Sequence, residues 1–248
     1  MALRRFKDAA RRVYQRGLDL LYPRGACCLI CGHPRLASAQ DCLCEACREA
    51  LKAYRVPPQA CERCLSPVEK GKPCAFCRSE AMRSIERVFS PYVYGSPVRS
   101  LIHAFKFTAC GEALPLLVSP MLDSLKIRDF DCVTPVPLHP KRLRQRGFNQ
   151  ALLLGQSLSK ETGIPLAPLL LRTRYRRPQS RTPLRSRARN VQDAFSCPSS
   201  AKGLRVLLLD DVRTSGATAG ACAKALMAAG AQSVSLLTCS VVYRRPAR

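Results

Sequence analysis

Two kinds of hydrophobic pattern alternate along the chain from residue 85 onward. Short apolar or β-branched runs are typical of strands covered on both faces by helices, and longer stretches with apolar residues at every third or fourth position predict helices. The strand-like runs occupy residues 86–94, 131–137, 166–171, 206–209 and 233–243. The helical patterns occupy residues 96–107, 114–125, 152–158 and 217–229. This alternation predicts an α/β fold with a parallel sheet and flanking helices.

The segment before residue 85 has a different pattern. Residues 3–21 place apolar side chains near helical spacing with arginines between them, which predicts an amphipathic helix over residues 1–24. We expect this helix to dock on the body of the protein, with a membrane surface as the alternative. Residues 25–84 are rich in cysteine, and residues 244–248 form a basic tail that we expect to be disordered. The 248 residues suffice for one ordinary domain, here residues 85–243, and a smaller module.

Eight of the fifteen cysteines form four pairs with the spacing C-x2-C, which favours metal ligation over a disulfide framework. Two such pairs supply the four thiolates of a closed, structural Zn2+ site. Sequential pairing predicts a double, zinc-ribbon-like module, because so short a segment lacks the apolar residues for a core of its own. An interleaved pairing is the alternative. Cys27, Cys42 and His33 lie near the first two pairs and could replace one of their ligands. The pairs are Cys28 and Cys31, Cys44 and Cys47, Cys61 and Cys64, and Cys74 and Cys77.

Residues 205–218 contain the strongest candidate for a ligand site. A buried strand ends at two acids, Asp210 and Asp211, and a short hydroxyl-rich turn with Gly216 leads into the next helix. This turn follows a strand and precedes a helix, where backbone N–H groups and the helix dipole favour an anion. The acids would repel a phosphate and suit a neutral diol or Mg2+, so the combination describes a ribose 5-phosphate. The alternative is a strand-end turn with two solvated acids.

Basic residues gather in two further places. Four cations between residues 141 and 146, including Arg142 and Arg146, follow the strand predicted over residues 131–137. If that strand neighbours residues 206–209, the cations face the same crevice; otherwise they are an exposed basic helix start. Residues 172–192 contain eight arginines and no acid, and we expect a mobile loop there that closes over a diphosphate or lies along a nucleic-acid backbone.

The helix predicted over residues 96–107 carries His103 and Lys106, for which we expect a solvated or packed role. The whole chain has 41 basic and 17 acidic residues and a formal net charge of +24, which indicates a polyanionic partner. No segment reaches the roughly 18 uninterrupted apolar residues of a membrane span. Charged residues also interrupt the N-terminal segment where a signal peptide needs an apolar core, so we expect a cytoplasmic protein.

In their order along the chain, these motifs resemble those of the ComF/GntX family, which has an N-terminal zinc module followed by a type I phosphoribosyltransferase domain. The resemblance spans roughly residues 20–243. It rests on the four cysteine pairs, Pro135-Val-Pro-Leu-His139, Arg142 with Arg146-Gly-Phe-Asn-Gln150, the arginine-rich stretch from Pro178-Gln179 to Arg189-Asn190, and Asp210-Asp-Val-Arg-Thr-Ser-Gly216.

The resemblance implies a site for phosphoribosyl pyrophosphate (PRPP) with Mg2+. Asp210 and Asp211 would then hold the ribose hydroxyls, Arg142 and Arg146 would face the pyrophosphate, and the following loop would wrap the 5-phosphate. The loop residues are Val212, Arg213, Thr214, Ser215, Gly216, Ala217 and Thr218. Arg213 and Ser215 stand where the family often has other small or hydroxyl residues.

The family is associated with natural competence, which implies single-stranded DNA or DNA-processing competence proteins as partners. Three activities stay open. The protein is an enzyme that transfers the phosphoribosyl group to an acceptor that no motif identifies, a non-catalytic protein that binds single-stranded DNA, or a regulator that responds to PRPP.

Overall fold

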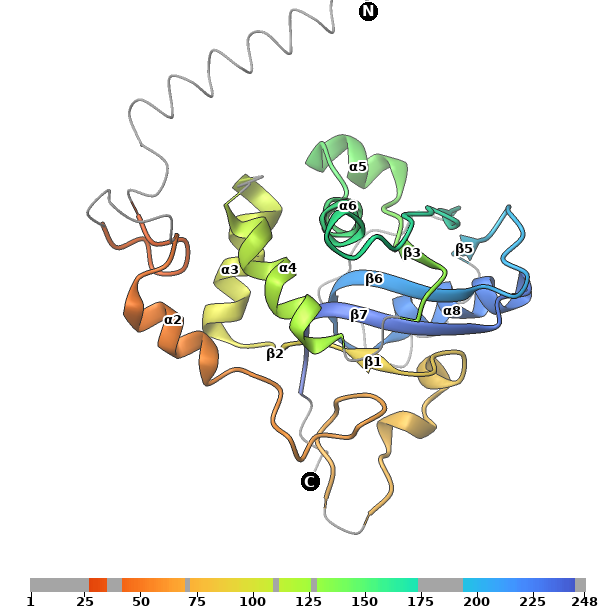
Figure 1. Ribbon diagram of the computed structural model, residues 1–248, viewed down its shortest axis with the longest axis horizontal. Helices are drawn as coiled ribbons and strands as arrows, with labels where there is room; N and C mark the ends of the chain where they lie inside the picture. Colours follow the sequence, from red (N-terminus) through yellow and green to blue (C-terminus); the bar gives the residue numbers. More distant parts are fainter. Residues whose placement is uncertain are drawn as a thin grey trace, which may run out of the picture.

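The computed structural model describes residues 27–34, 42–69, 72–108, 112–125, 129–173 and 194–243 (Figure 1). The amphipathic helix predicted over residues 1–24, most of the arginine-rich stretch and the basic tail of residues 244–248 lie outside the described residues. Within the described residues, no helix is long and apolar enough to cross a membrane.

A parallel sheet forms the centre of the molecule. Its strand order is β1-β7-β6-β3, and β2 also pairs with β7. The strands are β1 (Val88–Phe89), β2 (Tyr92–Val93), β3 (Cys132–Pro135), β6 (Arg205–Arg213) and β7 (Ser233–Val241). Along β6, Leu207 and Leu209 enter one buried cluster and Val206 and Leu208 the other, because successive side chains of a strand point to opposite faces. The prediction of a parallel α/β fold is therefore confirmed.

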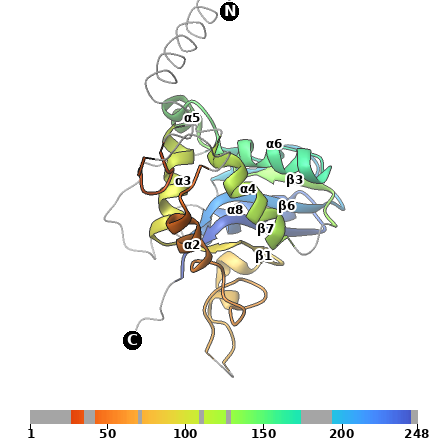
Figure 2. The same ribbon diagram turned by 60° about the vertical axis from the view of Figure 1, so that its left-hand side comes forward.

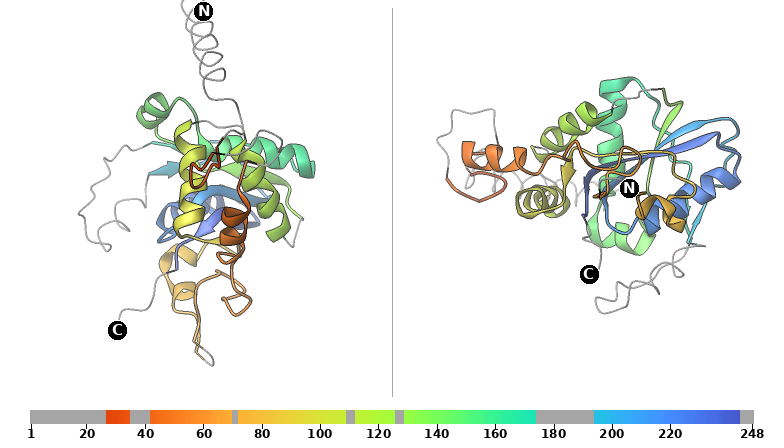
Figure 3. Two further views of the ribbon diagram at one scale, coloured as in Figure 1. Left: turned by 90° about the vertical axis from the view of Figure 1, so that its left-hand side faces the viewer. Right: turned by 90° about the horizontal axis from the view of Figure 1, so that it is seen from below.

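Helices cover both faces of this sheet (Figures 2 and 3). The cluster around Leu207 and Leu209 contains side chains of α3 (Ser96–Thr108), α4 (Ala113–Ser124) and α6 (Gln150–Thr162). The cluster around Val206 and Leu208 contains those of α8 (Ala217–Ala228). A shorter helix, α5 (Pro140–Arg146), connects β3 to α6. The helices α3, α4, α6 and α8 lie where the hydrophobic patterns predict them.

Three predicted strands differ from the structure, and the first of them, residues 86–94, divides into β1 and β2. Residues 166–171 form no continuous strand: Leu166 makes a single bridge to Val133, and β4 (Leu171–Arg172) pairs antiparallel with β5 (Phe195–Ser196). Pro165 and Pro168 lack the N–H groups that a central strand donates, which explains the interruption. In contrast, the strand expected at residues 206–209 continues through Arg213.

The two cysteine-rich segments lie on different parts of the molecule. The first leads into α2 (Glu45–Lys52), which packs beside α3, and its Cys28 and Cys47 belong to the same buried cluster as α3 and α4. The second leads into two single-turn helices, η1 (Phe76–Arg78) and η2 (Glu80–Met82), and its Cys64 belongs to the cluster that contains α8. In Figure 1 the orange segment with α2 lies to the left, and the gold segment lies below β1.

Candidate functional site

The carboxyl ends of β3 and β6 share one edge of the sheet. The strands pair in parallel from Cys132 with Val206 to Pro135 with Leu209, so the neighbour relation that the sequence leaves conditional is confirmed. Asp210 and Asp211 lie on β6 itself, directly after the residues that pair with β3. The chain after β3 enters α5 with its cations, and the chain after β6 enters α8. The acids, the α5 cations and the amino end of α8 therefore meet at this edge.

The turn of residues 214–216 joins β6 to α8 and is called here the β6–α8 turn. Gly216 caps α8 with φ of 73°, a left-handed conformation that favours glycine. The hydroxyl of Ser215 accepts a long hydrogen bond of 3.5 Å from the N–H of Ala217, and Thr214 is exposed. The first N–H groups of the twelve-residue helix α8 thus lie next to the hydroxyl groups of Thr214 and Ser215 in the chain. Both kinds of group can donate hydrogen bonds to an anion.

The two acids have different surroundings. Asp211 forms an ion pair of 2.5 Å with Lys106 of α3, and both side chains are mostly covered, with 18% and 21% exposed. Asp210 accepts a hydrogen bond of 2.9 Å from the N–H of Asp211. Burial first, and then the Asp211 carboxylate, raise the pKa of Asp210 to about 7. Asp210 therefore gains or loses a proton near neutral pH.

Lys106 is a site residue that sequence reasoning misses, because a solvated or packed role is expected for it. No local motif marks this lysine. Only the packing of α3 against the sheet brings its ammonium group to Asp211.

The predicted cations near the acids differ in burial and in their partners. Arg142 is half-buried on α5, and Arg146 donates a hydrogen bond of 3.1 Å to the side chain of Gln150. Arg172 belongs to β4, and its guanidinium lies 5.3 Å from the centre of the Phe195 ring. Burial and the nearby Arg142 lower the pKa of Arg172, while Asp210 acts in the opposite direction. Arg142, Arg172 and Asp210 are therefore electrostatic neighbours.

Arg213 has a different environment from the one expected of a loop residue. It ends β6, is only 3% exposed, and its guanidinium carbon lies 4.5 Å from the centre of the Phe76 ring. Phe76 belongs to the second cysteine-rich segment. The charge of Arg213 thus lies against an aromatic face, and contact of Arg213 with a phosphate stays a prediction.

The structure brings the eight paired cysteines together in sequential order. One group contains Cys28, Cys31, Cys44 and Cys47, called here the first cysteine group, and the other contains Cys61, Cys64, Cys74 and Cys77, called the second cysteine group. Within each group all sulfur atoms lie within 4.8 Å of one another. Cys27, Cys42 and His33 belong to neither group.

The sulfur atoms of both groups fit a tetrahedral ion. Four sulfurs at about 2.3 Å from one zinc ion lie about 3.8 Å apart. The distance between the sulfurs of Cys31 and Cys44 is 3.8 Å. In the second group, Cys61 and Cys77 are 3.5 Å apart and Cys64 and Cys74 are 3.4 Å apart. Each group therefore could hold one zinc ion.

The proton affinities of two thiols in the first group differ. Burial acts to raise the pKa of Cys28, but hydrogen bonds from the backbone of Cys31, Cys44 and Ile30 outweigh it and bring the value to about 6. One such bond, from the N–H of Cys44 to the sulfur of Cys28, is 3.4 Å long. Burial and the neighbouring thiols raise the pKa of Cys47. The backbone thus stabilises at least one thiolate before a cation binds.

Known proteins similar to this chain carry names connected with DNA and competence. The chain is 31% identical over 216 residues to the DNA utilization protein YhgH of Salmonella typhimurium, which covers 84% of this chain and 93% of the relative. It is 29% identical over 218 residues to competence protein F of Haemophilus influenzae, covering 82% and 93%. It is 27% identical over 212 residues to competence protein ComFC of Bacillus subtilis, covering 82% and 85%.

Solved structures resemble only part of the chain, and no protein-family model matches the sequence. The allosteric regulatory enzyme of purine biosynthesis aligns with 25% identity and a TM-score of 0.34. The glutamine PRPP amidotransferase of B. subtilis, complexed with ADP and GMP, aligns with 24% identity and a TM-score of 0.35. Each alignment covers half of this chain, which spans about a quarter of the solved chain.

The relatives from Salmonella, Haemophilus and Bacillus match the chain over 82–84% of its length. The chain belongs to the ComF family.

Proposed function

We propose that the edge formed by β3, β6 and α8 binds PRPP or another 5-phosphoribosyl ligand together with Mg2+, in a cytoplasmic protein that takes part in the handling of transforming single-stranded DNA. The observation that carries this proposal is the position of Asp210 and Asp211 near the carboxyl end of β6, separated from the β6–α8 turn only by Val212 and Arg213. A pair of acids that can bind a diol thus lies close to a turn that can bind an anion. The ribose hydroxyls and the 5-phosphate are similarly close in the ligand.

Each group at this edge has a role in the proposal. Asp210 and Asp211 accept hydrogen bonds from the ribose hydroxyls. The backbone of Val212, Gly216 and Ala217 lines the turn, and Thr214, Ser215 and Thr218 supply hydroxyl groups to the 5-phosphate. Arg142, Arg146 and Arg172 face the pyrophosphate. Mg2+ bound to the pyrophosphate would neutralise part of its charge.

Turnover would follow from the same geometry. The bond between C1 of the ribose and the pyrophosphate oxygen breaks, the electron pair leaves with pyrophosphate, and an acceptor nucleophile bonds to C1 and loses its proton to solvent. The cations stabilise the leaving charge, and the carboxylates orient the ribose.

The cysteine groups complete the proposal. We assign one structural Zn2+ ion to each group, because four thiolates leave no open position for a substrate. Zinc would then stabilise two segments in which the regular elements are α2 and the single-turn helices η1 and η2.

Calorimetric titration with PRPP and Mg2+ tests the ligand. We expect saturable binding in the wild type and at least about tenfold weaker binding in the Asp210→Asn/Asp211→Asn double variant, because the diol loses its charged acceptors. The double variant Asp123→Asn/Glu161→Gln makes the same charge change at exposed positions on α4 and α6 and serves as the control. Absence of both heat and a thermal shift in the wild type would refute the ligand.

A second candidate function uses the same fold without turnover. The formal net charge of +24 favours a polyanion as partner, and the protein would then bind single-stranded DNA directly or respond to PRPP by changing its affinity for DNA. Release of pyrophosphate in the presence of candidate acceptors identifies the enzyme. A DNA affinity that changes when PRPP is added identifies the regulator.

A further inference from the structure

The segment that carries the second cysteine group lies against the β6–α8 turn. Phe76 stands inside the pair formed by Cys74 and Cys77, and the guanidinium of Arg213, the residue directly before the turn, lies 4.5 Å from the centre of its ring. A Cβ atom added at Gly216 would lie 3.2 Å from Cζ of Phe76. One aromatic side chain of the cysteine segment therefore contacts both ends of the turn.

Backbone packing continues this contact along α8. A Cβ atom added at Gly220 would lie only 2.6 Å from the carbonyl oxygen of Ala81 and 2.8 Å from its Cα atom. The Cβ atom of Ala81 would also lie 3.4 Å from a Cβ atom at Gly216. The first turn of α8 thus packs directly on η2, at a distance that only glycine permits.

Both cysteine pairs of the second group hold the contacting segment. Phe76 lies within the pair of Cys74 and Cys77. Arg63, which lies within the pair of Cys61 and Cys64, donates hydrogen bonds to the carbonyl oxygens of Met82, the residue after Ala81, at 3.0 Å and of Ile85 at 2.9 Å. A metal ion bound by all four sulfurs would therefore hold both Phe76 and η2 in position.

We propose that the second cysteine group positions the β6–α8 turn, with Phe76 and Ala81 as positioning residues, so that metal loading of this group sets the affinity for an anionic ligand at the amino end of α8. The identity of that ligand as a 5-phosphoribosyl compound rests on the proposed function. The positioning itself does not. It gives zinc a regulatory role at the ligand site without contact between metal and ligand.

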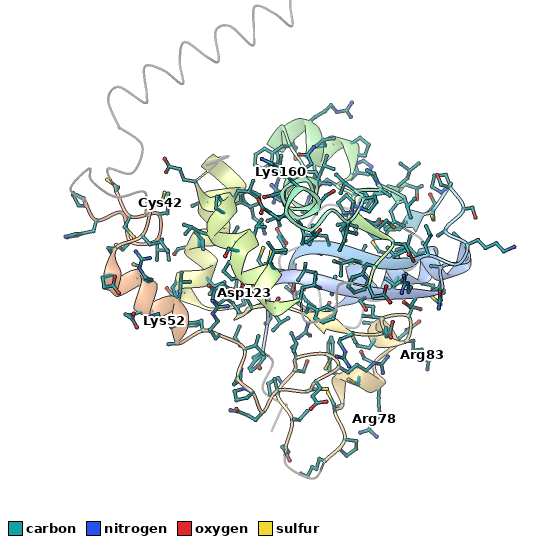
Figure 4. The ribbon with its side chains drawn as sticks, viewed as in Figure 1. Cys42, Lys52, Arg78, Arg83, Asp123 and Lys160 are labelled. Carbon is teal, nitrogen blue, oxygen red and sulfur yellow. The ribbon has the colours of Figure 1, made fainter. Side chains whose placement is uncertain are left out.

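The first cysteine group offers an internal comparison. Its Cys28 and Cys47 pack in the cluster of α3 and α4, on the other face of the sheet from α8. Figure 4 shows the separation: Cys42 marks the first segment at the left, and Arg78 and Arg83 mark the second segment below the sheet. Loss of metal from the first group should therefore leave the β6–α8 turn unchanged.

Hydrogen–deuterium exchange of residues 213–220 in the full chain tests the positioning. Phe76→Leu keeps all four thiolates and an apolar side chain but removes the aromatic face beneath Arg213. We expect unchanged zinc content and exchange about two- to thirtyfold faster in residues 213–220, with peptides of β7 unaffected. Phe76→Tyr, which retains the aromatic ring, should exchange at the wild-type rate.

Gly220→Ala tests the same contact from the side of α8. The added methyl group must push α8 away from η2, although alanine favours the helix itself. We expect the exchange change seen in Phe76→Leu. Lys224→Ala, one turn further along α8 at an exposed position, is the control and should show none.

Titration of the same variants with PRPP and Mg2+ separates the two proposals. Affinity should fall by the factor by which exchange rises, and it should fall for Cys61→Ser/Cys64→Ser but not for Cys28→Ser/Cys31→Ser. If the wild type binds no PRPP, the proposed function fails. The positioning proposal is then tested by hydrogen–deuterium exchange of residues 213–220 alone. If exchange of residues 213–220 is the same in wild type, Phe76→Leu and Gly220→Ala, the positioning is overturned.

Discussion

Asp210 and Asp211 are chemically identical neighbours with different electrostatic environments. Lys106 neutralises Asp211, whereas desolvation and the charge of Asp211 raise the pKa of Asp210. A carboxyl group that is partly protonated near neutral pH both donates and accepts hydrogen bonds, which suits a pair of hydroxyl groups. The residue types are evident from the sequence, but the difference between them arises only from packing.

The raised pKa of Asp210 predicts how the free energy of unfolding depends on pH. The unfolded-state pKa is about 3.9 and the folded-state pKa is about 7, so the folded state retains a proton that the unfolded state loses. This contribution to stability is complete below about pH 4 and is lost as the pH rises through 7. Between pH 5 and pH 8 the wild type should therefore lose on the order of 1–3 kcal/mol more than Asp210→Asn. Urea unfolding of both proteins across this range measures the difference, and parallel curves would contradict it.

The ion pair between Lys106 and Asp211 predicts a second change at the residue scale. Lys106→Met leaves the two acids without their nearest cation, so we expect a loss of about 1–3 kcal/mol at pH 8 and a smaller loss at pH 5, where protonation relieves the repulsion. Thermal unfolding at both pH values measures the loss. Lys160→Met makes the same substitution at an exposed lysine of α6, labelled in Figure 4, and should change stability little.

At the scale of single elements, Asn149 links the end of β3 to α6. Its side-chain oxygen accepts a hydrogen bond of 3.1 Å from the N–H of Ala151 and caps the helix, and its amide donates one of 3.1 Å to the carbonyl oxygen of Val136. The Gly-Phe-Asn-Gln motif singled out in the sequence thus contains a residue with a structural role. That role places α6 and β3 against one another beside the acids.

Substitution of Asn149 separates these two hydrogen bonds. Asn149→Ala removes both and should lower the free energy of unfolding by about 1–2 kcal/mol. Asn149→Asp keeps the cap and loses only the donor to Val136, so its loss should be smaller. Chemical denaturation of the three proteins gives the order, and equal losses in the two variants would show that the cap contributes nothing.

Element boundaries near the site could be predicted because local chemistry sets them. Ser96-Pro97 starts α3, and Gly147 and Gly163 end α5 and α6 in left-handed conformations. The sequential grouping of the cysteines is the simpler of the two pairings that the spacing allows, and the structure confirms it. The contacts of Lys106 with Asp211 and of Phe76 with Arg213 join residues more than a hundred positions apart, and no local pattern encodes them.

At the scale of the whole molecule, the excess of positive charge is the feature that the proposed ligand explains least. A single phosphoribosyl pyrophosphate requires a few cations, whereas the chain carries 41 basic and 17 acidic residues. Eight of the arginines fall within residues 172–192. Single-stranded DNA is a partner that would contact many of these cations. Each phosphate that an arginine or lysine neutralises releases a bound counterion, and this release favours binding.

This reasoning predicts the salt dependence of DNA binding. The logarithm of the affinity for an oligothymidine should fall with the logarithm of salt concentration by about 0.7 per phosphate neutralised, and the triple variant Arg174→Gln/Arg176→Gln/Arg177→Gln should reduce the slope by about 2. Fluorescence anisotropy between about 50 and 300 mM NaCl, without and with PRPP and Mg2+, measures this slope. The control Arg78→Gln/Arg83→Gln/Arg99→Gln removes three arginines from the described surface. A slope that changes only in the control would place the DNA on the described surface instead, and a PRPP-dependent affinity would require that the two ligands share one conformational equilibrium.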